Sequence, residues 1–306
     1  MGTHRYRVSG VGLVSILALD GLPRWSGPLK QPWRLVTAQR LPVSHPVSTT
    51  CQLIQHDDGS LAVSWDRLGS WWIRPRHREV RYALETGVSR EAFLDLLLGP
   101  VVSLLLTVEG SDPLHGCAVQ VGKEALAFLG QPGTGKSTMA AAFVLAGHRL
   151  VVDDLLTLQW RGSRPWVMPG YPEIRLWPGS GKRLIPAFSR LPRVVPTASK
   201  RRLDPRRFTG GFAHGPVALR AFYELRRARS ISRPMILPLP PREAFLVLAS
   251  NLYNLMFVSP RFLERQFHAF GTLTSRIPVR RFWLPYTVHD PLRLPQVVLD
   301  DLAQLA

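Results

Sequence analysis

The stretch Gly130-Gln131-Pro132-Gly133-Thr134-Gly135-Lys136-Ser137-Thr138 decides how the second half of this chain folds. It matches the pattern Gly-x-x-x-x-Gly-Lys-Ser/Thr in full, between an apolar strand pattern ending at Leu129 and a helix pattern opening at Ser137. Glycines let backbone N–H groups turn inward around phosphate oxygens, and a helix N-terminus adds partial positive charge. The stretch therefore predicts binding of a nucleoside triphosphate with Mg²⁺, in which Lys136 bridges the β and γ phosphates and Ser137 holds the ion.

Two adjacent acids follow the next predicted strand. The apolar run Arg149-Leu150-Val151-Val152 leads directly into Asp153 and Asp154. In such a pair, one carboxylate can hold a metal ion while the other accepts the proton of an attacking hydroxyl, and their repulsion keeps one ready as a base. The alternative is a pair of turn-capping residues.

Around these motifs the pattern is α/β. Strands at residues 118–121 and 125–129 can pair across Gly122-Lys123-Glu124, and the helix after the loop ends at Gly147. Residues 169–216 are rich in Pro and Arg, which indicates loops around the site. We expect five further elements: strands at 218–225 and 278–284, and helices at 241–257, 260–270 and 291–305.

Residues 1–110 have a different sequence pattern, which predicts a small antiparallel β unit that ends in a helix. Its expected strands are 33–36, 50–54, 61–65 and 71–73, with a hairpin turn at Asp57-Asp58-Gly59-Ser60. Ser89 is the expected start of the helix, because Phe93, Leu96 and Leu97 follow at helical spacing. Residues 111–306 would then form the catalytic domain.

Two apolar stretches have some features of membrane segments. Val8 to Leu19 follows basic residues as in a signal peptide, but it has no small-residue cleavage site and is better explained as a buried strand. Leu96 to Val108 is interrupted by Gly99-Pro100 and falls short of the roughly 20 residues that span a bilayer. We expect both to be core, and no membrane association.

Charge and cysteine content limit the partners and the compartment. The 306 residues include 39 Lys and Arg against 21 Asp and Glu, a net charge of +18 that attracts phosphates, acidic peptides or nucleic acid. The two cysteines, Cys51 and Cys117, form no CxxC pair, so neither a zinc ribbon nor a disulfide scaffold is indicated. A reducing cytoplasm fits this composition.

Taken in order, these motifs resemble the catalytic domain of the HPr kinase/phosphorylase family. The likeness covers about residues 112–176: Leu114-His115-Gly116, the loop, Gly-His-Arg-Leu-Val-Val-Asp-Asp at 147–154, and Glu173-Ile174-Arg175. The resemblance implies that His115 lies near the transferred phosphate and that Asp153 is the general base. It also implies that Asp154 and Glu173 complete the magnesium site, and that Arg175 neutralises charge on the transferred group.

The chain departs from that family in ways that favour its shorter relatives. The family's Pro-Gly-Arg-Asn segment is missing from the second half, and the loop ends Lys-Ser-Thr where the family has Lys-Ser-Glu. Some shorter relatives phosphorylate a serine of peptide precursors such as those of lasso peptides. We therefore expect an ATP- and Mg²⁺-dependent kinase that phosphorylates a serine on a peptide or small protein. A nucleic-acid-associated ATPase and a bifunctional HPr-type kinase/phosphorylase are the alternatives, and homo-oligomerisation stays open.

Overall fold

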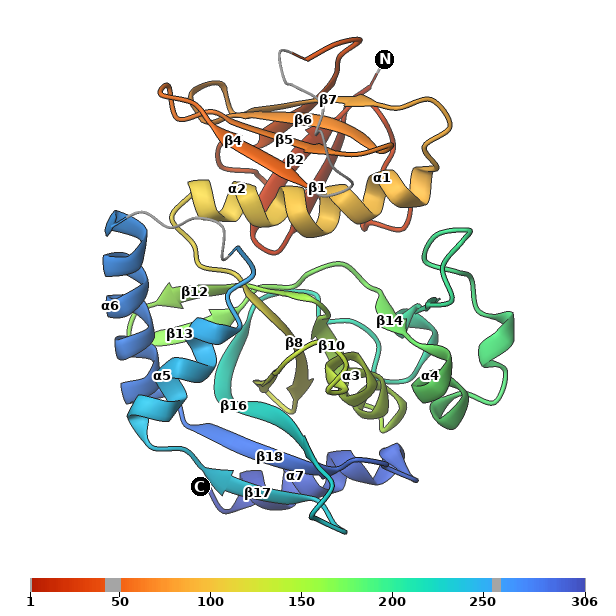
Figure 1. Cartoon of the computed structure of the whole chain (residues 1–306), viewed down its shortest axis with the longest axis vertical. Coiled ribbons are helices and arrows are strands. Elements are labelled where there is room, and N and C mark those ends of the chain that lie inside the picture. Colours follow the sequence, from red (N-terminus) through yellow and green to blue (C-terminus); the bar gives the residue numbers. More distant parts are fainter. Residues whose placement is uncertain (1, 42–50, 255–259, 306) are drawn as a thin grey trace. The chain divides into compact units, whose positions relative to one another are not determined.

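Alternating apolar side chains in the first part of the chain form a sheet of seven strands in the order β1-β2-β3-β7-β6-β5-β4 (Figure 1). The computed structural model describes residues 2–41, 51–254 and 260–305, and it divides into two compact units, Met1–Gly110 and Ser111–Ala306. The strands of the first unit are β1 (His4–Val8), β2 (Val11–Ser15), β3 (Trp33–Thr37), β4 (Gln52–Gln55), β5 (Leu61–Trp65), β6 (Gly69–Arg74) and β7 (Glu79–Leu84).

The pairing in this sheet corrects two expectations. The apolar run from Val8 to Leu19 is not a single strand, because Ser9 and Gly10 both have positive φ, 51° and 93°, and turn the chain into the β1–β2 hairpin. The sheet is also mixed, since β3 pairs in parallel with both β2 and β7. The predicted turn at 57–60 does join β4 to β5 as an antiparallel hairpin, while Thr50 of the expected strand lies outside the described residues.

A continuous apolar helix packs against this sheet. It runs through α1 (Arg90–Leu96), one π turn (Leu97–Val101) and α2 (Val102–Val108), and the Ser89 side chain caps its first turn as expected. Gly99-Pro100 does not interrupt it, because the π turn accommodates the missing N–H of proline. The segment Arg90–Val108 is long and apolar enough to cross a membrane, but 67% of its 18-residue apolar window is buried, and Phe93 stacks on Trp71 of β6. It is the core helix of this unit.

The second unit is built on a larger mixed sheet with the strand path β10-β8-β9-β16-β13-β12. Strands β8 (Leu114–Val121) and β9 (Glu124–Leu129) form the predicted antiparallel hairpin, and β9 pairs in parallel with β16 (Val217–Ala228). β16 in turn pairs in parallel with β18 (Val279–Pro285), so β9, β16 and β18 end at one edge of the sheet. The remaining strands are β10 (Arg149–Val152), β11 (Leu155–Leu156), β12 (Leu158–Arg161), β13 (Arg164–Val167), β17 (Met235–Pro238) and the separate pair β14 (Ile174–Leu176) and β15 (Arg201–Leu203).

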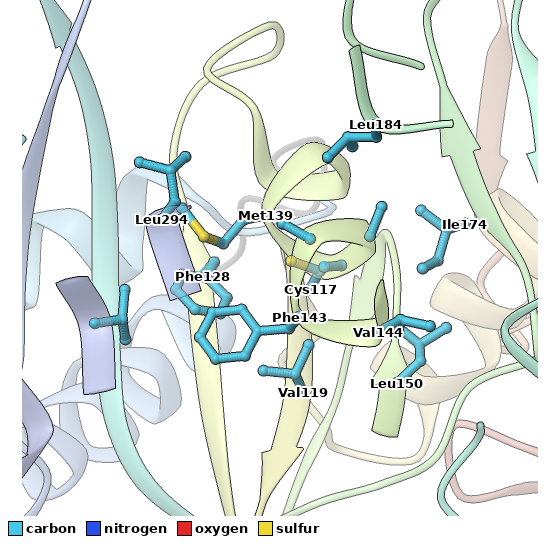
Figure 2. Packing of buried hydrophobic residues seen from close by; sticks show 14 of the residues in the cluster. Cys117, Val119, Phe128, Met139, Phe143, Val144, Leu150, Ile174, Leu184 and Leu294 are labelled. Atoms are coloured by element: carbon cyan, nitrogen blue, oxygen red, sulfur yellow. The ribbon is translucent and has the colours of Figure 1, made fainter. Parts of the chain in front are cut away.

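Helices cover both faces of this sheet and enclose two hydrophobic clusters. On one face, α3 (Lys136–Leu145) lays Met139 and Phe143 against Phe128 of β9, as Figure 2 shows. The same cluster takes in α4 (Pro178–Leu184) and α7 (Leu294–Ala303), and α5 (Pro241–Ser250) and α6 (Pro260–Arg276) pack on the other cluster. The protein is therefore a mixed α/β structure with an N-terminal β-rich sheet and a second mixed sheet, as the sequence predicts.

Some boundaries differ from the sequence expectation. Helix α5 ends at Ser250, and residues 255–257 of the predicted helix lie outside the described residues. Helix α6 continues to Arg276, six residues beyond the predicted end. The Pro- and Arg-rich part is partly regular, since it contains β14, α4 and β15.

Candidate active site

The glycine-rich loop leaves the end of β9 and enters α3 with backbone angles that only glycine adopts easily. Gly130 has φ 140°, and a Cβ atom there would lie 2.7 Å from the carbonyl oxygen of Leu225. The N–H of Gly130 donates to Oδ1 of Asn251 at 2.9 Å, which fixes the start of the loop. Gly135, with φ 111°, precedes α3 without a side-chain cap, so the first N–H groups of that helix remain available to an anion.

Lys136 lies inside the curl of the loop. Its Nζ donates to the carbonyl oxygens of Gly130, at 2.5 Å, and Gln131, at 3.4 Å, and the residue is 8% exposed. Burial lowers the pKa of this ammonium group, against the opposing charges of Cys117, Asp153 and Asp154. The carbonyl of Lys136 accepts from Sγ of the buried Cys117 at 3.2 Å, which ties the helix start to β8. The ammonium group is thus held where the loop would surround phosphate oxygens.

The two adjacent acids face different partners. Asp153 is 5% exposed; Ser137 Oγ donates to its Oδ1 at 3.0 Å, and the backbone N–H of Arg175 donates to its Oδ2 at 3.1 Å. Asp154 has a left-handed backbone, φ 85°, and its carboxylate lies 2.9 Å from Nδ1 of His115 and accepts from Tyr253 Oη at 3.4 Å. The left-handed turn separates the two carboxylates, so that only Asp153 contacts the loop serine.

These surroundings shift the pKa values of the two carboxyl groups in opposite directions. Burial, followed by the charge of Asp154, raises the pKa of Asp153 to about 6, although hydrogen bonds from Arg175 and Ser137 oppose the rise. Burial also raises the pKa of Asp154, but the hydrogen bond from His115 and the charges of His115, Arg175 and Lys200 outweigh it, and the net shift is downward. A carboxyl pair split in this way suits proton transfer by one member.

Glu173 and Arg175 stand at the start of β14. Arg175 Nε donates to Glu173 Oε1 at 2.9 Å, and Arg202 Nη1 lies 3.9 Å from the other carboxylate oxygen. The side chain of Arg175 reaches the cavity described below, whereas Glu173 is not among the residues that line it. Among the described residues, no group of three or more His, Cys, Asp or Glu side chains is arranged to hold a metal ion.

A cavity of about 740 Å³ brings most of the predicted residues together. The loop from Pro132 to Thr138 forms its floor, and His115, Asp153, Asp154 and Arg175 stand along one side. Gly130 and Gln131 of the predicted set are not in the lining. The other lining residues are Leu176, Trp177, Gly179, Ser180, Arg183, Lys200, Arg227 and Tyr286.

Several residues at this site belong to no sequence motif and were not predicted. Asn251 and Tyr253 come from the end of α5, about 120 residues beyond the loop, and contact Gly130 and Asp154. Arg227 Nε donates to the loop carbonyl of Thr134 at 3.2 Å. The Arg226-Arg227 cluster was visible in the sequence, but only the parallel pairing of β9 with β16 brings it to the loop. No local signal distinguishes Asn251 or Tyr253.

Comparison with known proteins adds a family relationship. No family model matches the chain. The HPr kinase/phosphorylase of Clostridium novyi (strain NT) is 34% identical over 87 residues. The chain is a distant homologue of HPr kinase/phosphorylase. The match spans 27% of this chain and 27% of that HPr kinase/phosphorylase, about a quarter of each protein.

A solved structure is also similar. The HPr(Ser) kinase/phosphatase from Coxiella burnetii aligns with 63% of this chain and 97% of its own, with a TM-score of 0.35 and 13% sequence identity. The sequence match to the Clostridium novyi protein confirms the predicted resemblance to HPr kinase/phosphorylase.

Proposed function

We propose that this chain is an ATP- and Mg²⁺-dependent kinase that transfers the γ-phosphoryl group to a serine hydroxyl of a peptide or small protein. In this proposal residues 111–306 are the catalytic domain and have the P-loop kinase fold of the HPr kinases. The observation that carries it is Asp153, a buried carboxylate with a raised pKa, held between Ser137 of the loop and the N–H of Arg175 in a cavity floored by the loop.

The residues of the cavity suit the parts of such a transfer. The loop N–H groups and Lys136 bind the phosphates. Asp153 takes the proton of the serine hydroxyl, whose oxygen forms a bond to the γ-phosphorus as the bond from that phosphorus to the β,γ-bridging oxygen breaks. Arg175 and His115, both lining the cavity, face the charge that develops on the transferred group.

The donor set is compatible with magnesium. Ser137 and Asp154 present oxygen ligands to the cavity, and Mg²⁺ prefers oxygen donors together with substrate phosphates and water. We propose that Ser137, Asp154 and Glu173 hold the ion, directly or through water; this requires Glu173 to turn from Arg175 toward the cavity. When bound, the ion supplies charge neutralisation of the phosphates.

Positive charge around the cavity supports a peptide acceptor with acidic residues. Lys200 and Arg175 line it beside the acidic pair, and the charges of both lower the pKa of Asp154. Such a rim attracts anionic groups and raises the rate of encounter. The free thiols of Cys51 and Cys117 suit a cytoplasmic location, which is part of the proposal.

The test is transfer of labelled phosphate. The protein is incubated with γ-labelled ATP, Mg²⁺ and either HPr or peptides encoded beside its gene, and labelled serine is identified by mass spectrometry. We expect Asp153→Asn to slow transfer at least 100-fold, on the order of the loss of a general base. The control Asp66→Asn, outside the lining of the cavity, should leave transfer unchanged. Transfer by Asp153→Asn at the wild-type rate would show that another group is the base. ATP hydrolysis that needs nucleic acid, with no labelled peptide, would replace the kinase by the nucleic-acid-associated ATPase.

A further inference from the structure

The cavity has a second flank, opposite the acidic one, that the proposed transfer does not use. Because β9, β16 and β18 run parallel, the residues that follow them meet at one edge of the sheet: the loop after β9, Arg227 at the end of β16 and Tyr286 after β18. Asp153 follows β10, which is separated from β9 by β8 and lies on the other side of the loop from β16. The loop therefore runs between an acidic flank and a flank of arginine and tyrosine.

Two arginines build the second flank and fasten it to the loop. Arg227 donates through Nε to Thr134 O and through Nη1 to the carbonyls of Pro285, at 3.2 Å, and Tyr286, at 2.8 Å. Arg183 of α4 donates to Val288 O at 3.0 Å. Both side chains thus bind the segment that follows β18, and Arg227 also joins that segment to the phosphate loop.

These two arginines differ from most others at the site in their lack of a carboxylate partner among the described residues. Neither Arg183 nor Arg227 forms an ion pair with a carboxylate among the described residues, although both line the cavity. Burial, followed by the charge of Arg183, lowers the pKa of the Arg227 guanidinium. Two like charges held together at a cavity wall favour an anion between them, and the phosphates nearest the ribose would lie on this side if the γ-phosphate lies by Asp153.

Tyr286 offers an aromatic face beside those charges. It lines the cavity and is 58% exposed, while the Arg229 guanidinium lies over its ring at 4.5 Å from the centroid. A cation covers one face only, so the other face is accessible for stacking. Exposed tyrosine rings stack nucleobases without reading their edges, because every base has a π face.

We propose that Tyr286 is the platform for the nucleobase of the bound nucleoside triphosphate, with Arg227 and Arg183 holding the phosphates nearest the ribose. This assignment rests on the proposed function for the γ-phosphate end and adds the opposite end. It predicts that adenine and guanine nucleotides bind with affinities within a few fold of each other, because stacking on Tyr286 does not distinguish their edges.

The experiment separates the base from the phosphates. Calorimetry with Mg²⁺ measures the affinity of the full chain for AMP-PNP, GMP-PNP and inorganic tripolyphosphate. We compare wild type with Tyr286→Ala, Tyr286→Phe and the control Trp160→Ala, an exposed aromatic of the same unit that also carries an arginine, Arg276, over its ring. Circular dichroism and thermal unfolding without nucleotide check that each variant folds.

We expect Tyr286→Ala to weaken AMP-PNP and GMP-PNP about tenfold and to leave tripolyphosphate unchanged. Tyr286→Phe and Trp160→Ala should bind all three ligands like wild type. Equal affinity of Tyr286→Ala and wild type for both nucleotides would overturn the nucleobase assignment while leaving the kinase proposal intact, and an equal loss for tripolyphosphate would show a role in phosphate binding instead. A wild type that binds neither nucleotide nor tripolyphosphate would refute the proposed function itself, and this assignment with it.

Discussion

Asp153 and Asp154 show how two identical neighbours acquire different chemistry. The left-handed backbone at Asp154 sends its carboxylate to His115, and the extended end of β10 leaves Asp153 buried beside Ser137. Aspartate tolerates this backbone better than most residues. The different surroundings of the two carboxylates, rather than the residue type, give the pair one member with a raised pKa and one with a lowered pKa.

A second residue-scale feature is His148, whose burial makes stability depend on pH. Its ring packs on Phe143 at 5.3 Å between centroids, and burial lowers its pKa. The unfolded chain binds the proton more tightly, with a pKa near the ordinary histidine value of about 6.5. The stabilisation is therefore complete above that pH and is lost as pH falls from there through the lowered pKa of the folded state. We expect His148→Gln to reduce the fall in melting temperature between pH 7.5 and pH 5.

The matched control is the exposed His214→Gln, which should keep the wild-type profile. Parallel pH profiles for His148→Gln and wild type, measured by thermal unfolding at constant ionic strength, would contradict this role of His148.

The parts of the site that sequence reasoning predicts are those with local signatures. The loop, Asp153, Asp154, His115 and Arg175 come from motifs that fix both residue type and spacing, and the structure brings them to one cavity. The location of Asn251 and Tyr286 at the site was not predicted, because it depends on which strands pair. A single sequence carries little information on pairing between distant strands. The functional roles of all these residues stay predictions until the variants are measured.

At the scale of elements, strands and helices with clear periodicity were predictable, and special backbone positions were less so. The β4–β5 and β8–β9 hairpins follow from turn residues between apolar runs. The β1–β2 hairpin was not predicted, because its turn, Ser9-Gly10, lies within an otherwise continuous apolar pattern. Both turn residues have positive φ. The parallel pairs of β3 bring together segments that are not joined by a short turn, and no local pattern indicates them.

The loop before β16 contains a close approach that a glycine alone permits. A Cβ atom on Gly210 would lie 1.8 Å from the backbone oxygen of His148, where β10 begins, whereas a Cβ atom on Gly215 would meet nothing within 4 Å. Gly210→Ala must displace backbone on one side, and we expect a loss of about 1–3 kcal/mol in the free energy of unfolding, the usual cost of overpacking.

Urea denaturation of both variants provides the measurement. Gly215→Ala should change the midpoint little, and a Gly210→Ala variant as stable as Gly215→Ala would show that the loop moves away from β10 without cost.

For the whole molecule, the net charge of +18 is the property most open to misinterpretation. Many arginines are engaged inside the structure: Arg281 pairs with Glu224 and Glu243, Arg280 with Asp301, and Arg265 with Asp112. Such arginines stabilise contacts between elements and do not by themselves form a nucleic-acid surface. The proposed kinase reaction needs no nucleic acid.

We therefore expect only unspecific, salt-sensitive binding to nucleic acid. Affinity for a 20-base-pair duplex should fall roughly tenfold or more between 50 and 200 mM salt, as counterion release requires. ATP hydrolysis should change less than about twofold when the duplex is added at low salt, where binding is strongest. The measurement is fluorescence anisotropy with a parallel ADP-release assay, and stimulation of hydrolysis by the duplex would favour the ATPase alternative.

The contact between Asp153 and position 175 has a consequence for how this site tolerates replacement. The hydrogen bond is made by the main chain of Arg175, while its guanidinium pairs with Glu173. Nineteen of the twenty amino acids, all except proline, keep a main-chain N–H. An alanine at this position would remove the guanidinium and preserve the support of the carboxylate, and a proline would remove both. Comparing the two replacements therefore separates the role of the guanidinium from the role of the main-chain N–H.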